Sequence, residues 1–129
     1  MHIEHMALWT HQLESLRHFY EHYFGAQAGA RYDNPAKGFS SYFLSFDSGA
    51  RLELMSRDDI PVERLDPVLQ RTGFIHLCFA LGSVEAVDAF YARALADGLP
   101  LLEAPRWTGD GYYELTLQDP DGNRLEVSL

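Results

Sequence analysis

The sequence contains an internal repeat in which each copy keeps one histidine and one glutamate at matching positions. His76 lies 71 residues after His5, and the Phe-Tyr pair at 90–91 lies 71 residues after the pair at 19–20. Beyond these pairs the spacing becomes 73, which relates Arg51-Leu52-Glu53-Leu54 to Arg124-Leu125-Glu126-Val127. A repeat of this length predicts two supersecondary units in one chain. Two histidines and two glutamates at equivalent positions form a set of metal ligands.

Each copy has the pattern of a β-α-β-β-β unit. Short alternating segments predict strands over 3–9, 26–33, 39–46 and 51–55 in the first copy, and over 73–81, 99–103, 112–118 and 124–129 in the second. Apolar residues at helical spacing predict one helix after the first strand of each copy, with Thr10 and Ser83 as N-caps and Gly25 and Gly98 at the ends. Residues 104–111 are expected to be a loop.

The domain organisation that follows is a single α+β domain over 1–129. Module 1 covers about 1–57 and module 2 about 73–129, and residues 58–72, which are charged and punctuated by prolines, connect them with room for a helical turn. We expect the two sheets to lie edge to edge with the helices on one face.

Strand alternation assigns the four repeated residues to a common face. In each of their strands, His5, Glu53, His76 and Glu126 point opposite to the apolar residues that the helices must cover. Each residue alone is typical of an ordinary strand surface, and duplication can copy a structural His and Glu. The coincidence of all four on one face favours a site for a first-row divalent ion with positions left open for water or substrate.

Composition excludes several other functions. The net charge of −9 argues against binding to nucleic acid. No apolar run is long enough to span a membrane, and the first residues lack the features of a signal peptide. A single cysteine, Cys78, fits a cytoplasmic location. It lies on the same strand face as His76, and we expect it to be a small residue beside the site. A soft metal ligand and a nucleophile are the alternative roles.

These motifs resemble the vicinal-oxygen-chelate superfamily, which includes glyoxalase I, extradiol dioxygenases and bleomycin resistance proteins. The resemblance covers essentially the whole chain, and its most specific segment is Asp119-Pro120-Asp121-Gly122-Asn123-Arg124-Leu125-Glu126. It implies two βαβββ modules that form a cupped mixed sheet with helices on the outer face. The ligand order His, Glu, His, Glu is most similar to that of glyoxalase I. This similarity implies a divalent ion, Ni²⁺ or Zn²⁺ first, with Fe²⁺ or Mn²⁺ as alternatives.

The chain departs from bacterial glyoxalase I beside the ligands. That enzyme usually has Arg and Asn four residues after its first two ligands, where they contact glutathione, and this chain has Trp9 and Arg57 there. We therefore expect Trp9 to offer a stacking wall and Arg57 to meet an anionic group of a substrate that is not clearly glutathione-dependent. Arg106 and Trp107, in the loop predicted before a strand lining the site, are further candidates for substrate binding.

The resemblance implies isomerase or lyase chemistry of the lactoylglutathione lyase type. A small substrate would be chelated through two neighbouring oxygens, and a base would remove a proton to give an enediolate. Glu126 is the expected base and Glu53 the reciprocal choice. A non-catalytic drug-binding protein and a non-haem iron dioxygenase remain alternatives. A homodimer is expected, because open sheets leave exposed edges.

Overall fold

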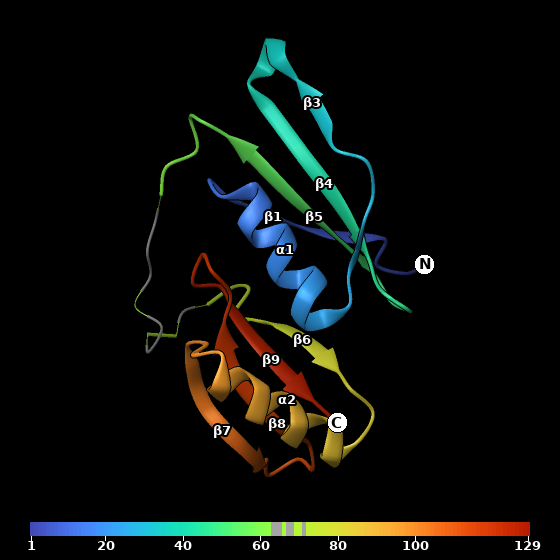
Figure 1. The fold of residues 1–129 in the computed structure, drawn as a ribbon, viewed down its shortest axis with the longest axis vertical. Coiled ribbons are helices and arrows are strands. Elements are labelled where there is room, and N and C mark those ends of the chain that lie inside the picture. The colour runs from blue at the N-terminus through green and yellow to red at the C-terminus, as the bar shows by residue number, and fades with distance from the viewer. Residues whose placement is uncertain (63–65, 67–68, 71) are drawn as a thin grey trace. The chain divides into compact units, whose positions relative to one another are not determined.

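A computed structural model describes residues 1–62, 66, 69–70 and 72–129 of the chain (Figure 1). The chain divides into two compact units, Met1–Glu63 and Arg64–Leu129. The sequence predicts room for a helical turn in the connecting segment 58–72. Residues 63–65, 67–68 and 71 of this segment lie outside the described residues. Neither helix in the described part of the chain has the length and apolar character to cross a membrane.

The first unit is a mixed five-stranded sheet with one helix. Its elements are β1 (His5–Trp9), α1 (Leu13–Phe24), β2 (Gln27–Ala28), β3 (Tyr32–Asn34), the 3-10 helix η1 (Pro35–Lys37), β4 (Phe39–Ser45) and β5 (Arg51–Arg57). The strand order is β1-β5-β4-β2, with β3 also paired to β4. β1 runs parallel to β5, and the other pairs are antiparallel.

The second unit repeats this order with four strands. Its elements are β6 (Leu77–Ala80), α2 (Val84–Ala96), β7 (Leu101–Trp107), β8 (Tyr113–Gln118) and β9 (Arg124–Ser128). The strand order is β6-β9-β8-β7, with β6 parallel to β9 and the remaining pairs antiparallel. The predicted α+β class and the two βαβββ modules are therefore confirmed, each unit having its own mixed sheet and helix.

One face of each sheet is buried by the helix of the same unit. In the first unit, Leu16 and Tyr20 of α1 and Leu52 and Leu54 of β5 are almost fully buried, and α1 contacts β5 and β4. The second unit buries a similar set: Val87, Leu115, Leu117, Leu125 and Val127. The opposite faces carry the residues that alternate with these core positions. The face assignment expected from strand alternation is thus observed within each unit.

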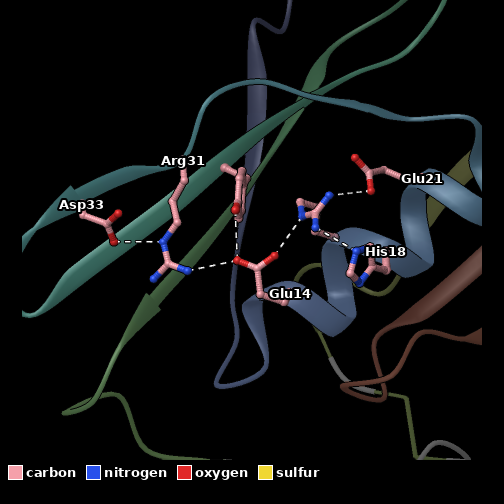
Figure 2. A network of polar contacts seen from close by, with 7 residues as sticks. Glu14, His18, Glu21, Arg31 and Asp33 are labelled. Atoms are coloured by element: carbon pink, nitrogen blue, oxygen red, sulfur yellow. Dashed lines mark hydrogen bonds and ion pairs between the residues drawn. The ribbon is translucent and has the colours of Figure 1, made fainter.

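Polar contacts at the start of α1 hold the helix to its sheet (Figure 2). The Glu14 carboxylate accepts hydrogen bonds from Tyr42 at 2.9 Å and from Arg31 at 3.0 Å, and Arg31 also pairs with Asp33. Arg17 extends the network along the helix to Glu21. These contacts lie on the helix side of the sheet, away from His5 and Glu53.

The helix ends match most of the sequence expectations. Ser83 is the N-cap of α2 and accepts a hydrogen bond from the Ala86 amide, and Gly25 ends α1 in the left-handed conformation at φ 65°. Thr10 is not the N-cap of α1, because Gln12 occupies that position without a side-chain cap. The Thr10 hydroxyl instead accepts from the Gln12 amide, two residues on. This local turn competes with capping for the same hydroxyl.

Three predicted segments have different limits in the structure. β6 begins at Leu77, so His76 directly precedes the strand, and the weak strand at 26–33 is two short strands, β2 and β3. The prediction of a loop over 104–111 is wrong for residues 104–107, because β7 continues to Trp107. The β7–β8 register shifts twice, and the second shift, between Glu103 and Arg106, spans Pro105, which has no amide proton to donate to a regular ladder.

Candidate metal centre

The first His–Glu pair lies on neighbouring parallel strands. Ala7 of β1 is in register with Glu53 of β5, and His5 is two residues before Ala7 on the same face. The His5 Nε2 atom is 3.9 Å from the Glu53 Oε2 atom. The other ring nitrogen, Nδ1, contacts the carboxylate of Glu4, which also pairs with Arg51. A carboxylate on one imidazole nitrogen orients the ring and leaves the other nitrogen facing the site.

The second pair is built in the same register. Cys78 of β6 is opposite Glu126 of β9, as Ala7 is opposite Glu53, and His76 is two residues before Cys78. The His76 Nε2 atom is 3.3 Å from the Glu126 Oε2 atom. Both glutamate side chains are largely shielded from solvent, whereas both histidines are more than one-third exposed. The two units thus present equivalent half-sites with one imidazole and one carboxylate each.

The donor atoms of the second half-site are spaced for a shared cation, and those of the first lie further apart. Metal bonds of about 2.0–2.2 Å to nitrogen and oxygen place two ligands of one ion roughly 3 Å apart, and the two observed N–O separations are 3.9 and 3.3 Å. Within the described residues, no group of three or more His, Cys, Asp or Glu side chains is close enough to hold an ion. The four predicted ligands are therefore divided two and two between the units.

The half-sites differ in the strand beside the glutamate. In the first unit, Phe43 of β4 is opposite Glu53, and its ring meets the His5 ring edge-on at 5.3 Å. The Arg51 guanidinium stacks on the same ring at 4.2 Å. In the second unit the equivalent position is Thr116, opposite Glu126. The first half-site is therefore bordered by an aromatic ring and a cation, and the second by a hydroxyl.

A second carboxylate, Glu114, accompanies Glu126 on the site face of the second unit. Arg106 donates to Glu114 at 3.1 Å and to Glu103 at 3.0 Å, and Thr116 donates to Glu103 at 2.9 Å. Burial, reinforced by the nearby Glu126 charge, raises the pKa of Glu114 above its ordinary value, and Arg106 partly offsets this. The arrangement can share a proton between two adjacent carboxyl groups.

The four residues predicted to bind substrate are divided between the units, and the two in the second unit lie on opposite faces of their sheet. Trp9 and Arg57 are in contact, with the guanidinium 5.3 Å from the indole centroid, on the face of His5 and Glu53. Arg106 lies on the site face of the second unit, where it holds Glu114. Trp107 packs on Tyr113, whose hydroxyl bonds to Asp88 of α2, so Trp107 lies on the face opposite Glu126.

Three neighbours of the ligands were not expected from the sequence: Glu4, Phe43 and Glu114. Glu4 adjoins His5, and an acidic residue next to a candidate ligand is a signal that could have indicated its role. Phe43 and Glu114 could have been placed on the site face by alternation within their strands. Their positions beside the ligands depend on the pairing of β4 with β5 and of β8 with β9.

Cys78 lies at an exposed position in register with Glu126. Its Sγ atom donates to the Ser128 hydroxyl at 3.3 Å. Burial and the Glu126 charge raise the pKa of the thiol. A raised pKa reduces the thiolate fraction at neutral pH, and the thiolate is the form that attacks or binds metal. The side chain borders Glu126 as a small residue.

Comparisons with known proteins agree with this fold. A family model described as Glyoxalase/Bleomycin resistance protein/Dioxygenase superfamily matches residues 2–127. A lactoylglutathione lyase from Agrobacterium tumefaciens is 25% identical, with 98% of this chain and 91% of that chain covered and a TM-score of 0.68. A glyoxalase family protein from Enterococcus faecalis is 24% identical over 100% and 96% of the chains, with a TM-score of 0.71.

A further solved structure, a glyoxylase/bleomycin resistance protein/dioxygenase domain from Frankia sp. EAN1pec, shares the fold with a TM-score of 0.83 at 19% identity. It covers 100% of this chain and 97% of that chain. No curated protein sequence matches the chain significantly.

Proposed function

Because the chain belongs to the Glyoxalase/Bleomycin resistance protein/Dioxygenase superfamily, we propose that it is a metal-dependent isomerase or lyase of the glyoxalase I type. The observation that supports this proposal is the equivalent register of the two His–Glu pairs, with imidazole and carboxylate atoms 3.9 and 3.3 Å apart. Both pairs lie on the sheet face opposite the helix of their unit, where an imidazole and a carboxylate are directed away from the core.

His5, Glu53, His76 and Glu126 would hold the ion, with Ni²⁺ or Zn²⁺ as the first candidates and Fe²⁺ or Mn²⁺ as alternatives. When bound, a divalent ion supplies Lewis-acid polarisation of two neighbouring substrate oxygens. The Glu4 carboxylate at His5 Nδ1 fixes the orientation of that imidazole, so its Nε2 faces the site. His76 has no acidic residue at the equivalent preceding position, which is Ile75.

Glu126 is the proposed base, and Glu53 is the reciprocal choice. A carboxylate can take the proton from the substrate carbon and return it to the adjacent carbon. The neighbours of the two glutamates favour Glu126, because it lies beside Glu114, a second carboxyl with a raised pKa. Glu53 faces the Phe43 ring, which neither accepts nor donates a proton. Glu126 therefore has a polar environment suited to a transient proton, and Glu53 has an apolar one.

The proposed setting is cytoplasmic, with a small-molecule substrate and a homodimeric protein. Glutathione dependence is not part of the proposal, since Trp9 and Arg57 occupy the positions expected for glutathione contacts. A panel of dicarbonyls with and without several thiols identifies the substrate head group and any thiol requirement.

Metal analysis and paired variants test the proposal. Chelator-treated protein is titrated with Ni²⁺ and Zn²⁺, and bound metal is measured by elemental analysis. We expect one ion for each set of four ligands, with His76→Gln weakening binding by about 10- to 100-fold and Glu126→Gln lowering kcat by about 10²- to 10⁴-fold. Glu85→Gln, at an exposed position in the first turn of α2, is the matched control and should change neither value.

Three outcomes would contradict the proposal. Protein that takes up no Ni²⁺ or Zn²⁺ would favour a non-catalytic binding protein. Turnover that requires both Fe²⁺ and O₂ would indicate a dioxygenase. Full isomerase activity in a folded, metal-loaded Glu126→Gln variant would remove Glu126 as the base, and the same measurement on Glu53→Gln then tests the reciprocal assignment.

A further inference from the structure

Three aromatic side chains, two of them exposed and one half-buried, form a cluster on the site face of the first unit. This ring cluster consists of Trp9, Tyr32 and Phe39, from β1, β3 and β4. The Phe39 ring lies 6.1 Å from both of the others and is perpendicular to the Trp9 ring. Trp9 remains 40% exposed and Tyr32 55% exposed. Aromatic rings gathered on an accessible face, instead of the core, are typical of a surface that binds a ligand.

A cation borders the ring cluster on the same face. Arg57 is directly opposite Phe39 in the β4–β5 ladder, and its guanidinium lies over the Trp9 ring. Its Nε atom is paired with Asp59. Among the described residues, no hydrogen bond involves its Nη1 or Nη2 atoms. The fork of the guanidinium is thus available to an anionic group that reaches the rings.

A hollow next to Arg57 provides space for such a group. A cavity of about 470 Å³ is lined by Lys37, Gly38, Arg57, Asp58 and Asp59. Two basic side chains therefore border the same hollow. The two aspartates balance their charge, and Asp59 is engaged by Arg57.

The ring cluster is aligned with the first half-site but separated from it. Trp9 is four residues after His5, and Arg57 is four residues after Glu53. At about 3.3 Å per residue these separations are roughly 13 Å. Even spacing keeps both ends on one face, with Met55 between Glu53 and Arg57. A molecule held at the half-site would need an extended tail to reach the rings.

We propose that the ring cluster and Arg57 bind the distal part of the substrate, and that this part is a planar ring carrying an anionic group. The inference rests on the proposed function for the reacting end of that substrate. Face-on stacking on Trp9 with an edge-on contact to the perpendicular Phe39 ring selects a flat ring, and the guanidinium fork selects a carboxylate or a similar anion. Glutathione has no ring, so this substrate class differs from a glutathione conjugate of a small aldehyde.

The two tryptophans of the chain allow a direct test. Trp9 lies in the ring cluster, and Trp107 lies on the opposite face of its own sheet, so the two indole N–H signals in a ¹H–¹⁵N spectrum report on different surfaces. Chelator-treated full-length protein is titrated with 2-naphthoate, with neutral 2-naphthylmethanol and with cationic 2-naphthylmethylammonium. Cyclohexanecarboxylate serves as an anion without an aromatic ring. Trp9→Leu and Trp107→Leu assign the two signals.

We expect 2-naphthoate to shift the Trp9 indole signal and leave that of Trp107 in place, with a Kd about tenfold lower than those of the other three probes. Arg57→Gln should abolish the preference for the carboxylate over the alcohol, and Trp9→Leu should weaken 2-naphthoate binding about tenfold. Arg93→Gln is the matched control, because this arginine also lies over an aromatic ring, that of Phe90, but on α2. It should leave the Kd unchanged.

The inference is overturned if 2-naphthoate shifts neither indole signal or both equally, or if the ammonium compound binds as tightly as the carboxylate. Because the titration uses metal-free protein, its result does not depend on the half-sites. If the protein takes up no metal but 2-naphthoate shifts the Trp9 indole signal, the proposed enzymatic function is refuted and this ligand class is supported. If turnover depends on metal but 2-naphthoate does not shift the Trp9 signal, the enzymatic function is supported and this ligand class is refuted.

Discussion

Replacing Arg106 with glutamine tests the electrostatics beside Glu126. Arg106 donates to Glu114 at 3.1 Å, and the Glu114 side chain is only 11% exposed, whereas that of Arg106 is 44% exposed. A hydrogen bond to a charged group contributes about 1.5–3 kcal/mol, and partial exposure of the arginine reduces this by solvent screening. We expect Arg106→Gln to lower the free energy of unfolding of chelator-treated protein by about 1–2 kcal/mol at pH 7.

The size of this loss should depend on pH. The folded-state pKa of Glu114 is raised above its ordinary value of 4.5 by burial and by Glu126, so the folded protein holds the proton more tightly than the unfolded chain does. Ionising Glu114 therefore costs stability above the folded-state pKa, and this cost is absent below 4.5. Arg106 lowers that pKa, so its removal increases the cost. The deficit of Arg106→Gln should shrink as the pH falls from 7 towards 4.5.

Thermal unfolding followed by circular dichroism measures the effect. For a chain of this size, the expected loss corresponds to a Tm decrease of about 3–8 °C at pH 7. Glu103→Gln is the matched control, since it changes the exposed partner of the same arginine and should shift the Tm by less than about 2 °C. In a Glu114→Gln background, Arg106→Gln should have little further effect. An equal deficit at pH 7 and pH 4.5, or a full effect in that background, would refute the reasoning.

Three further substitutions test local features of the fold. Ser83→Ala removes the side chain that caps α2, and chemical denaturation should show a loss of about 1 kcal/mol. Gly25→Ala places a Cβ at φ 65°, and the same measurement should show a loss of about 1 kcal/mol even though no atom lies within 4 Å of that Cβ. Ser40 and Arg31 hold the pKa of Asp33 below its ordinary value of 3.8, so Asp33 contributes stability above that pH and loses it as the pH falls further. Thermal scans of Asp33→Asn should therefore show a Tm deficit at pH 6 that narrows below pH 3.8.

The face and register of the candidate ligands could be predicted from the sequence because each strand is covered on one side only. Leu52 and Leu54 are buried and Glu53 between them is not, so alternation alone assigns the glutamate to the open face. The repeat then implies that Glu126 is placed in the same way. The structure adds the cross-strand partners, Ala7 and Cys78, whose equivalence follows from the two matching parallel pairs.

The surroundings of Glu126 could not be predicted in the same way. Glu103 is opposite Thr116 and Arg106 is opposite Glu114, so three steps along β7 match two steps along β8. This register shift places Glu103 and Arg106 on one face despite their odd separation, and it places Trp107 on the other. Pro105 and the nearby glycine Gly109 favoured a loop in the sequence. A proline in a strand is compatible with pairing at an edge or at such an irregularity, and β7 has both features. No sequence pattern here locates either of them.

The two half-sites can be compared directly, because the repeat places the same ligand residues in the same strand pairing in both units. The ligand pairs keep the same residue types and the same register, whereas the position opposite each glutamate is Phe43 in one unit and Thr116 in the other. The Phe43 ring beside Glu53 lies on the same sheet face as the rings near Arg57. A hydroxyl beside Glu126 instead joins a network of carboxylates held by Arg106. The two glutamates therefore differ in these neighbours, and the two histidines differ in the preceding residue, which is Glu4 beside His5 and Ile75 before His76.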